Sequence, residues 1–126
     1  GGFTGEEAVV FARELKHAEG GCIDVSSGGI SPLARIDYGR MYQVPFADAI
    51  RHGAQIAVQC VGAVQGLDHA NTVLAAGRAD LVAMARPHLA DPYLALHAAA
   101  EVGKYDMPWP KQYLAAKPRP KAGEPD

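Results

Sequence analysis

The sequence predicts an α/β protein with a small parallel sheet, and three observations support this prediction. Three short apolar runs, each bounded by turn residues, are too short for helices and are typical of strands. Segments with helical spacing of apolar residues, or with helix-capping residues, lie before, between and after these runs. The resulting order α-β-α-β-α-β-α favours parallel strands joined by right-handed crossovers.

The first predicted helix begins directly after Thr4. Thr4 and Glu7 have the spacing of a capping box, in which each side chain bonds the backbone N–H of the other residue. Gly20 and Gly21 are expected to end the helix. Its apolar face is expected to comprise Ala8, Phe11, Ala12 and Leu15.

A strand over residues 22–26 follows, and it ends in a Ser-Ser-Gly-Gly turn over residues 26–29. The loop over residues 30–44 is long, and long ordered loops are often functional. Pro45 then opens a helix that is expected to run to about Arg51. The side chains that this helix is expected to bury are Phe46, Ala47 and Ile50.

The second strand is predicted over residues 55–61, with Gly62 at its end. The helix predicted over residues 67–76 directs Val73 and Leu74 inward, and Gly77 suits its C-terminal cap.

The third strand, a buried run over residues 81–84, is expected to end at Arg86, because Pro87 disfavours helical backbone at the preceding residue. Asp91 and Pro92 then suit the N-cap and first position of a helix that Gly103 stops. Residues 107–110 interrupt regular structure, and residues 111–116 are expected to form a last short turn or helix. We expect Trp109 to pack this segment onto helices, and we expect residues 117–126 to be a disordered tail.

Composition excludes several classes of protein. The chain has 126 residues, 48% of them hydrophobic, which suits one modest domain or part of a larger one. Its net charge of −2 gives no basic footprint for nucleic acid. No apolar run approaches the ~20 residues of a membrane helix, and no signal peptide is visible, so a cytoplasmic protein is expected. Without an initiator methionine, the chain is expected to be a fragment or a processed form. Cys22 and Cys60 are expected to be reduced, buried thiols, and no histidines have metal-ligand spacing.

The predicted strand ends carry the candidate site. In a parallel sheet the turn at Ser27, the small residues Gly62 and Ala85, and Arg86 all follow carboxyl ends of strands, where α/β proteins place ligands. Backbone N–H groups at small residues and an arginine fork suit a phosphate. The alternative interpretation is that Gly62 only makes a tight turn and that Arg86 pairs with an aspartate, either Asp80 or Asp91.

The same segments resemble a known family. In order, they are Ile-Asp-Val-Ser-Ser-Gly at residues 23–28, Tyr-Gln-Val-Pro-Phe-Ala at 42–47, Val-Gly at 61–62, Gly-Arg-Ala-Asp-Leu-Val at 77–82, Ala-Arg-Pro at 85–87 and Ala-Asp-Pro at 90–92. Their order and spacing, over about residues 4–113, resemble the C-terminal part of the old yellow enzyme family of FMN-dependent (β/α)₈ oxidoreductases. The ending Trp-Pro-Lys-Gln-Tyr-Leu is similar to the reductase-like domain of bifunctional salicylyl-CoA 5-hydroxylase and anthraniloyl-CoA monooxygenase-type proteins.

The resemblance implies that residues 1–116 are the C-terminal portion of a TIM barrel, strands six to eight, that holds part of an FMN site. By motif, the backbone N–H groups of Gly62 and Ala85 and the guanidinium of Arg86 would bind the FMN phosphate, and Ser27 would line the same pocket. Family members often have glycine where Ala85 stands, and a methyl group there still allows an N–H contact.

The family's substrate-anchoring pair, its tyrosine proton donor and its flavin-ring contacts come from earlier strands and have no counterpart here. The sequence therefore names no catalytic residue. It implies an enzyme segment that uses FMN and NAD(P)H and acts on a small molecule, an activated alkene or an aromatic acyl-CoA derivative. Alternatives are a half-barrel that needs the rest of the barrel or another subunit, and a phosphate-binding α/β segment of another (β/α)₈ family. Without such a partner, three strands could still form a small open α/β sandwich.

Overall fold

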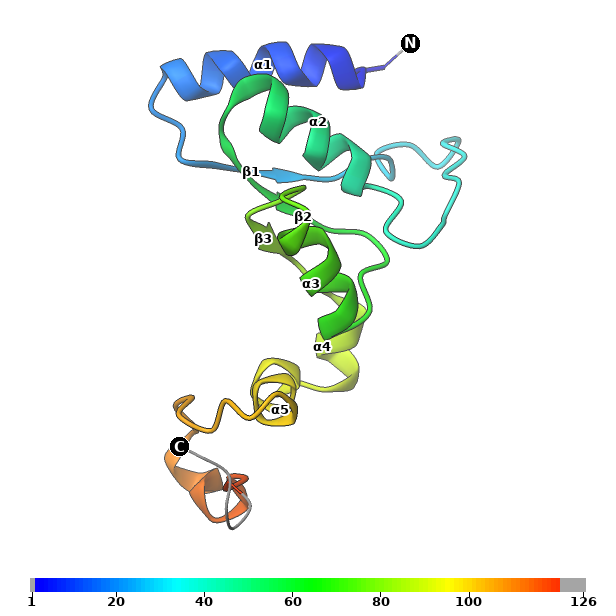
Figure 1. Ribbon diagram of the computed structural model, residues 1–126. Coiled ribbons are helices and arrows are strands. Elements are labelled where there is room, and N and C mark those ends of the chain that lie inside the picture. The colour runs from blue at the N-terminus through cyan, green and yellow to red at the C-terminus, as the bar shows by residue number, and fades with distance from the viewer. Residues whose placement is uncertain (1, 121–126) are drawn as a thin grey trace. The chain divides into compact units, whose positions relative to one another are not determined.

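The computed structural model describes residues 2–120, in two compact units. The first unit extends to Met84, and the second begins at Ala85. The first unit contains a three-stranded parallel sheet with the strand order β1-β2-β3 (Figure 1). The strands are β1 (Cys22–Val25), β2 (Ala57–Cys60) and β3 (Leu81–Val82). This confirms the predicted α/β class and the parallel strands.

Helices alternate with these strands. The first unit contains α1 (Gly5–His17), α2 (Val44–Ala54) and α3 (Leu67–Ala75). The second unit contains α4 (Arg86–Ala90), α5 (Leu94–Glu101) and the 3₁₀ helix η1 (Lys111–Ala116). The predicted alternation is therefore confirmed, with one short helix, α4, that the sequence did not indicate.

Helices cover one face of the sheet, and side chains alternate along the strands accordingly. Val25, Val58 and Cys60 point into the core beneath α1 and α2, where Val58 and Cys60 are completely buried. The opposite face carries the exposed Cys22 and Leu81, and the Leu81 side chain is 54% exposed. Leu81 and Cys22 are therefore not buried as predicted, because no helix of the first unit covers this face.

The capping box of α1 is confirmed. The Thr4 hydroxyl accepts from the Glu7 N–H at 3.2 Å, and the Glu7 carboxylate accepts from the Thr4 N–H at 2.7 Å. The helix ends at His17, and Glu19 rather than a glycine takes the left-handed conformation, with φ of 63°. Gly20 is required there for another reason, since a Cβ would lie 2.8 Å from the Leu15 carbonyl oxygen.

Three large side chains predicted to face inward are instead exposed. The exposed fractions are 54% for Phe11, 42% for Phe46 and 40% for Leu74. The smaller side chains on the same helices are buried as expected: Ala12 of α1, Ala47 and Ile50 of α2, and Val73 of α3. Phe11 and Phe46 line an open groove of about 480 Å³ beside β1 and α1. Periodicity identified the helices correctly, but it did not identify which neighbours would cover each side chain.

The C-terminal end of α3 behaves as predicted. Gly77 follows the helix with φ of 66°, the left-handed conformation that a glycine tolerates without strain.

The segment after β3 corrects the prediction most clearly. Arg86 is the first residue of α4, although Pro87 follows it. Proline is tolerated in a first helical turn, because the N–H that it lacks has no partner there. Asp91 is not the cap of a helix starting at Pro92; α5 begins at Leu94, and the Asp91 carboxylate accepts from the Tyr93 N–H at 3.0 Å.

The second unit has no fully buried residue in its helices, and aromatic and polar contacts hold it together. His97 Nδ1 lies 2.7 Å from Asp91 Oδ2, and the Trp109 ring lies 6.1 Å from the His97 ring. Trp109 therefore packs the last segment onto α5. Most of the predicted disordered tail, residues 121–126, lies outside the described residues. None of the described helices is long and apolar enough to cross a membrane.

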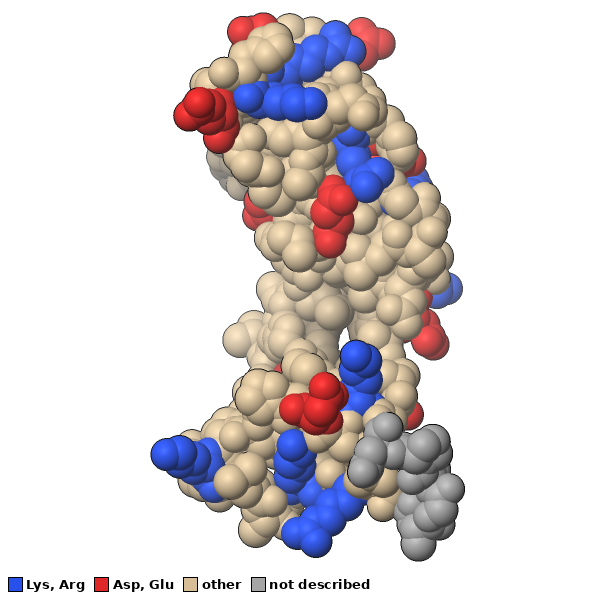
Figure 2. Space-filling model, turned by 60° about the vertical axis from the view of Figure 1, so that its left-hand side comes forward, with Lys and Arg blue, Asp and Glu red and all other residues tan. Residues whose placement is uncertain are grey.

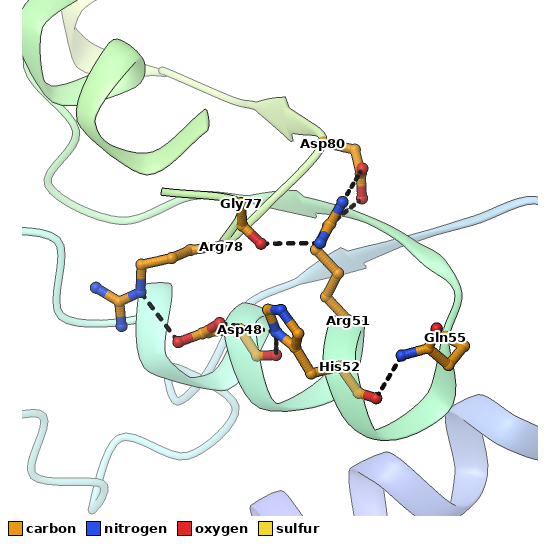
Figure 3. Close-up of polar contacts among 7 residues, drawn as sticks. All are labelled: Asp48, Arg51, His52, Gln55, Gly77, Arg78 and Asp80. Carbon is orange, nitrogen blue, oxygen red and sulfur yellow. Dashed lines mark hydrogen bonds and ion pairs between the residues drawn. The ribbon is translucent and has the colours of Figure 1, made fainter. Parts of the chain in front are cut away.

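An ion pair at the amino ends of the strands links α2 to the sheet (Figure 3). Arg51 donates two hydrogen bonds of 3.0 Å to the Asp80 carboxylate, and its third nitrogen donates to the Gly77 carbonyl oxygen at 2.9 Å. Asp80 also accepts from the Val58 N–H at 3.0 Å, while its own N–H donates to the Val58 carbonyl at 2.9 Å. These contacts fix the register of β3 against β2.

We predict that Asp80→Asn lowers the free energy of unfolding by about 1 kcal/mol at pH 7, since Arg51 loses its bidentate carboxylate partner at a site where both side chains are about one-third exposed. Asp37→Asn in the exposed loop is the control, and it should change stability little. Urea denaturation of the three proteins measures the difference. Equal stability of wild type and Asp80→Asn would contradict the prediction.

The same pair predicts a pH dependence. The hydrogen bonds from Arg51 and from the Val58 N–H lower the pKa of Asp80 from its ordinary value of 3.8. A carboxylate with a lowered pKa contributes stability above its unfolded pKa, and this contribution is lost as pH falls through the lowered value. The stability gap between wild type and Asp80→Asn should therefore close in acid below about pH 4.

Candidate functional site

The carboxyl ends of β1 and β2 are joined by one side chain, that of Gln43. Its oxygen accepts from the backbone N–H of Ser27 and, at 2.9 Å, from the Ser27 hydroxyl. Its nitrogen donates to the Val61 carbonyl oxygen at 3.0 Å. Gln43 is 4% exposed, and it is the one polar residue among the buried residues of the described chain. The structure thus brings the predicted residues Ser27 and Gly62 to the same place.

Gln43 occupies this position because it is the N-cap residue of α2, which follows the long loop. Ser, Thr, Asp and Asn are preferred at N-caps because their short side chains bond the helix N–H groups. The Gln43 side chain makes no such cap bond and reaches across to the two strand ends. Sequence reasoning missed this residue, although a glutamine immediately before the helix-opening Val-Pro pair was an available signal.

Ser27 lies at the predicted strand end, but its donors are already used. Both its N–H and its hydroxyl group donate to Gln43. A phosphate needs donors, so Ser27 in this conformation shapes the strand end and does not donate to an anion.

Gly62 is required by both conformation and space. Its φ is 109°, and a Cβ there would lie 2.5 Å from the Gln43 side-chain nitrogen and 3.0 Å from the Tyr42 ring. The next residue, Ala63, also has a positive φ, of 52°. In the described part of the chain, the N–H groups of Gly62 and Ala63 have no hydrogen-bond acceptor. Adjacent free N–H groups of this kind can bind an anion.

Ala85 and Arg86 belong to the second unit. Arg86 is exposed, and within that unit its guanidinium forms no ion pair or hydrogen bond with a described residue. The two carboxylates considered as its partners are engaged elsewhere, Asp80 by Arg51 and Asp91 by His97. The hydrogen bond from His97 also lowers the pKa of Asp91. The Arg86 guanidinium therefore remains available for a ligand.

Other chemically reactive side chains form no cluster with these residues. Burial raises the pKa of the Cys60 thiol, which stays protonated and packs as a small apolar group. Tyr38 and Tyr42 of the long loop stack edge to face with ring centres 5.4 Å apart. Among residues 2–120, no three His, Cys, Asp or Glu side chains are placed to hold a metal ion. On the face drawn in Figure 2, lysine and arginine side chains are interspersed with acidic ones.

Comparison with known proteins finds relatives that are named NADPH dehydrogenase. No protein-family model matches the chain. It is 40% identical over 116 residues to a protein named NADPH dehydrogenase from Listeria monocytogenes, covering 92% of this chain and 34% of that protein. It is 43% identical over 102 residues to an NADPH dehydrogenase from Geobacillus, covering 81% of this chain and 30% of that protein. The chain thus spans about a third of the length of the curated relatives it matches.

Gly62→Ala tests the geometry of the strand end. We expect it to destabilise the chain by about 2–4 kcal/mol, because the added methyl group meets Gln43 and Tyr42 at a strained φ. Gly66→Ala is the matched control, since Gly66 has nearly the same φ, 106°, but nothing within 4 Å of its Cβ position. In the control, the free energy of unfolding should fall only by the backbone strain of a positive φ, about 1–2 kcal/mol. Equal losses in thermal or urea denaturation would refute the close packing around Gly62.

Proposed function

We propose that the chain is the C-terminal part of an FMN-dependent NAD(P)H oxidoreductase of the old yellow enzyme type, and that it holds the phosphate-binding part of the flavin site. The observation that carries this proposal is the 40% identity, along 92% of the chain, with proteins named NADPH dehydrogenase. The N–H groups of Gly62 and Ala63, which have no acceptor among residues 2–120, and the guanidinium of Arg86 are donors of the kind that a phosphate requires.

Taken unit by unit, the donor chemistry of these residues suits a flavin phosphate, and the family resemblance is what assigns them to one site. Gly62 and Ala63 offer backbone N–H groups without internal acceptors, and Arg86 offers a planar guanidinium that can bind two phosphate oxygens. Ala85 would add its own N–H, as the resemblance implies. Ser27 takes a supporting part, since its donors are held by Gln43.

FMN, when bound, accepts a hydride from a nicotinamide and passes it to the substrate. This chain's residues would hold the phosphate end and fix the position of the cofactor, so we assign them binding and no catalytic role. Activated alkenes and aromatic acyl-CoA derivatives stay the predicted substrates. The similarity of the chain's ending to salicylyl-CoA 5-hydroxylase-type proteins also stays a prediction.

A second proposal, a half-barrel that needs the rest of a barrel or another subunit, has support of its own. Within the first unit, one face of the sheet has no helix over it, and Leu81 on that face is 54% exposed. Phe3, Phe11 and Phe46 line the open groove beside β1. Edge strands with exposed apolar groups favour pairing with further chain.

Arg86→Ala tests the first proposal. The purified chain is titrated with FMN and with riboflavin, which lacks the phosphate, and flavin fluorescence is followed. We expect wild type to prefer FMN and Arg86→Ala to lose about 10- to 100-fold in FMN affinity. Riboflavin should bind only weakly to both proteins, because the ring contacts are expected from earlier strands that this chain does not contain. His88→Ala, two residues away, is the control and should keep the preference.

Two results would count against this proposal. Unchanged FMN affinity in Arg86→Ala would remove the arginine from the site. Binding of inorganic phosphate without any preference for FMN over riboflavin would favour a phosphate-binding segment of another (β/α)₈ family.

The partner-requiring proposal predicts self-association of the isolated chain. Light scattering after size-exclusion chromatography should show a mass that rises with concentration, because exposed apolar faces and strand edges pair. Leu81→Lys on the uncovered face should reduce this association. Leu89→Lys is the control, since Leu89 is 83% exposed on α4, outside the sheet. A stable monomer at every concentration would rule this proposal out.

A further inference from the structure

We propose that Gln43 is a positioning residue of the phosphate site, and this inference rests on the function proposed above. Gln43 does not touch the anion. It sets the spacing between the turn at Ser27 and the loop at Gly62, so that the N–H groups of Gly62 and Ala63 stay free to bind it.

The hydrogen bonds of Gln43 support this role. Its side-chain oxygen accepts from both the N–H and the hydroxyl group of Ser27. Its nitrogen donates to the carbonyl oxygen of Val61, the residue directly before Gly62. One side chain therefore satisfies polar groups on both strand ends, and none of the N–H groups of Gly62 and Ala63 is used in doing so. Because Gln43 is only 4% exposed, water does not easily replace these hydrogen bonds.

The shape of the loop depends on the same side chain. Gln43 and Tyr42 fill the space in which a Cβ of residue 62 would lie, with the Gln43 nitrogen 2.5 Å from that position. The loop therefore approaches Gln43 as closely as a glycine permits. Removing the amide would release Val61 and open this contact, and the loop would lose its fixed conformation.

Glutamine is the residue that these contacts require. Asparagine is one carbon shorter, and methionine has neither the donor nor the acceptor. Glutamate keeps the acceptor for Ser27 but presents an oxygen, in place of N–H, to the Val61 carbonyl. It would also add a negative charge close to a bound phosphate.

The test compares Gln43→Met with Gln59→Met. Gln59 is a fair control because its nitrogen also joins the first two strands, donating to Asp24 at 3.2 Å. For each purified protein, the ratio of FMN to riboflavin affinity measures the contribution of the phosphate alone. We expect Gln43→Met to lose most of the wild-type ratio, about tenfold or more, through weaker FMN binding, while riboflavin binding stays weak in every protein and Gln59→Met keeps the ratio.

Amide hydrogen exchange gives a readout that needs no ligand. The Ser27 amide should exchange faster in Gln43→Met than in wild type or Gln59→Met, because its acceptor is gone. If Gln43→Met does not fold, the uncharged Gln43→Leu takes its place, since it also removes both the acceptor for Ser27 and the donor to Val61 and adds no charge near the phosphate.

The outcomes separate the two proposals. If Arg86→Ala abolishes the preference for FMN over riboflavin and Gln43→Met retains it, the role of Gln43 alone is overturned. If wild type binds FMN no more tightly than riboflavin, the proposed function and this inference are both overturned. Unchanged exchange at Ser27 in Gln43→Met would overturn the bridge itself.

Discussion

The sheet depends most on the hydrogen bonds that the Asp80 carboxylate accepts. β3 has two residues, so its ladder with β2 is short, and Asp80 adds a bond to the Val58 N–H directly before that ladder begins. Its other bonds come from Arg51 of α2, which also holds the turn after α3 through Gly77. Both side chains are about one-third exposed, so screening limits the Coulomb energy, and the value of the pair lies in its fixed bidentate geometry. One carboxylate thus orients two strands, a helix and a turn.

The opposite ends of the strands use different chemistry. There the neutral amide of Gln43 joins the turn at Ser27 to the Val61 carbonyl, and no carboxylate of residues 2–120 forms a hydrogen bond with it. This difference suits a site for an anion, since a buried carboxylate in that place would repel a phosphate. The sheet is therefore held by charges where its strands begin and by a neutral bridge where they end. The two free N–H groups of Gly62 and Ala63 lie beside the neutral bridge.

The uncovered face and the groove also bear on function. The chain spans about a third of the relatives' length, and it exposes apolar side chains that a complete domain usually buries, among them Leu81 and Phe46. The proposed phosphate site at the strand ends is compatible with an incompletely covered sheet in one segment. The proposal concerns what the segment would bind, and the exposed face concerns what the segment needs in order to be stable.

Local interactions explain what the sequence determined by itself. The order of elements as far as β3, the capping box of Thr4 and Glu7, and the glycine after α3 depend on residues a few positions apart, and these were predicted correctly. The importance of Gly62 was also visible, although its reason was not. Tertiary structure alone decided the rest. Arg51 and Asp80 are 29 positions apart, and Gln43 bonds residues 16 and 18 positions away. Whether Phe11 and Leu81 are buried depends on which segments pack over them. Such choices follow from contacts between distant parts of the chain, and periodicity and capping preferences carry no information about those contacts.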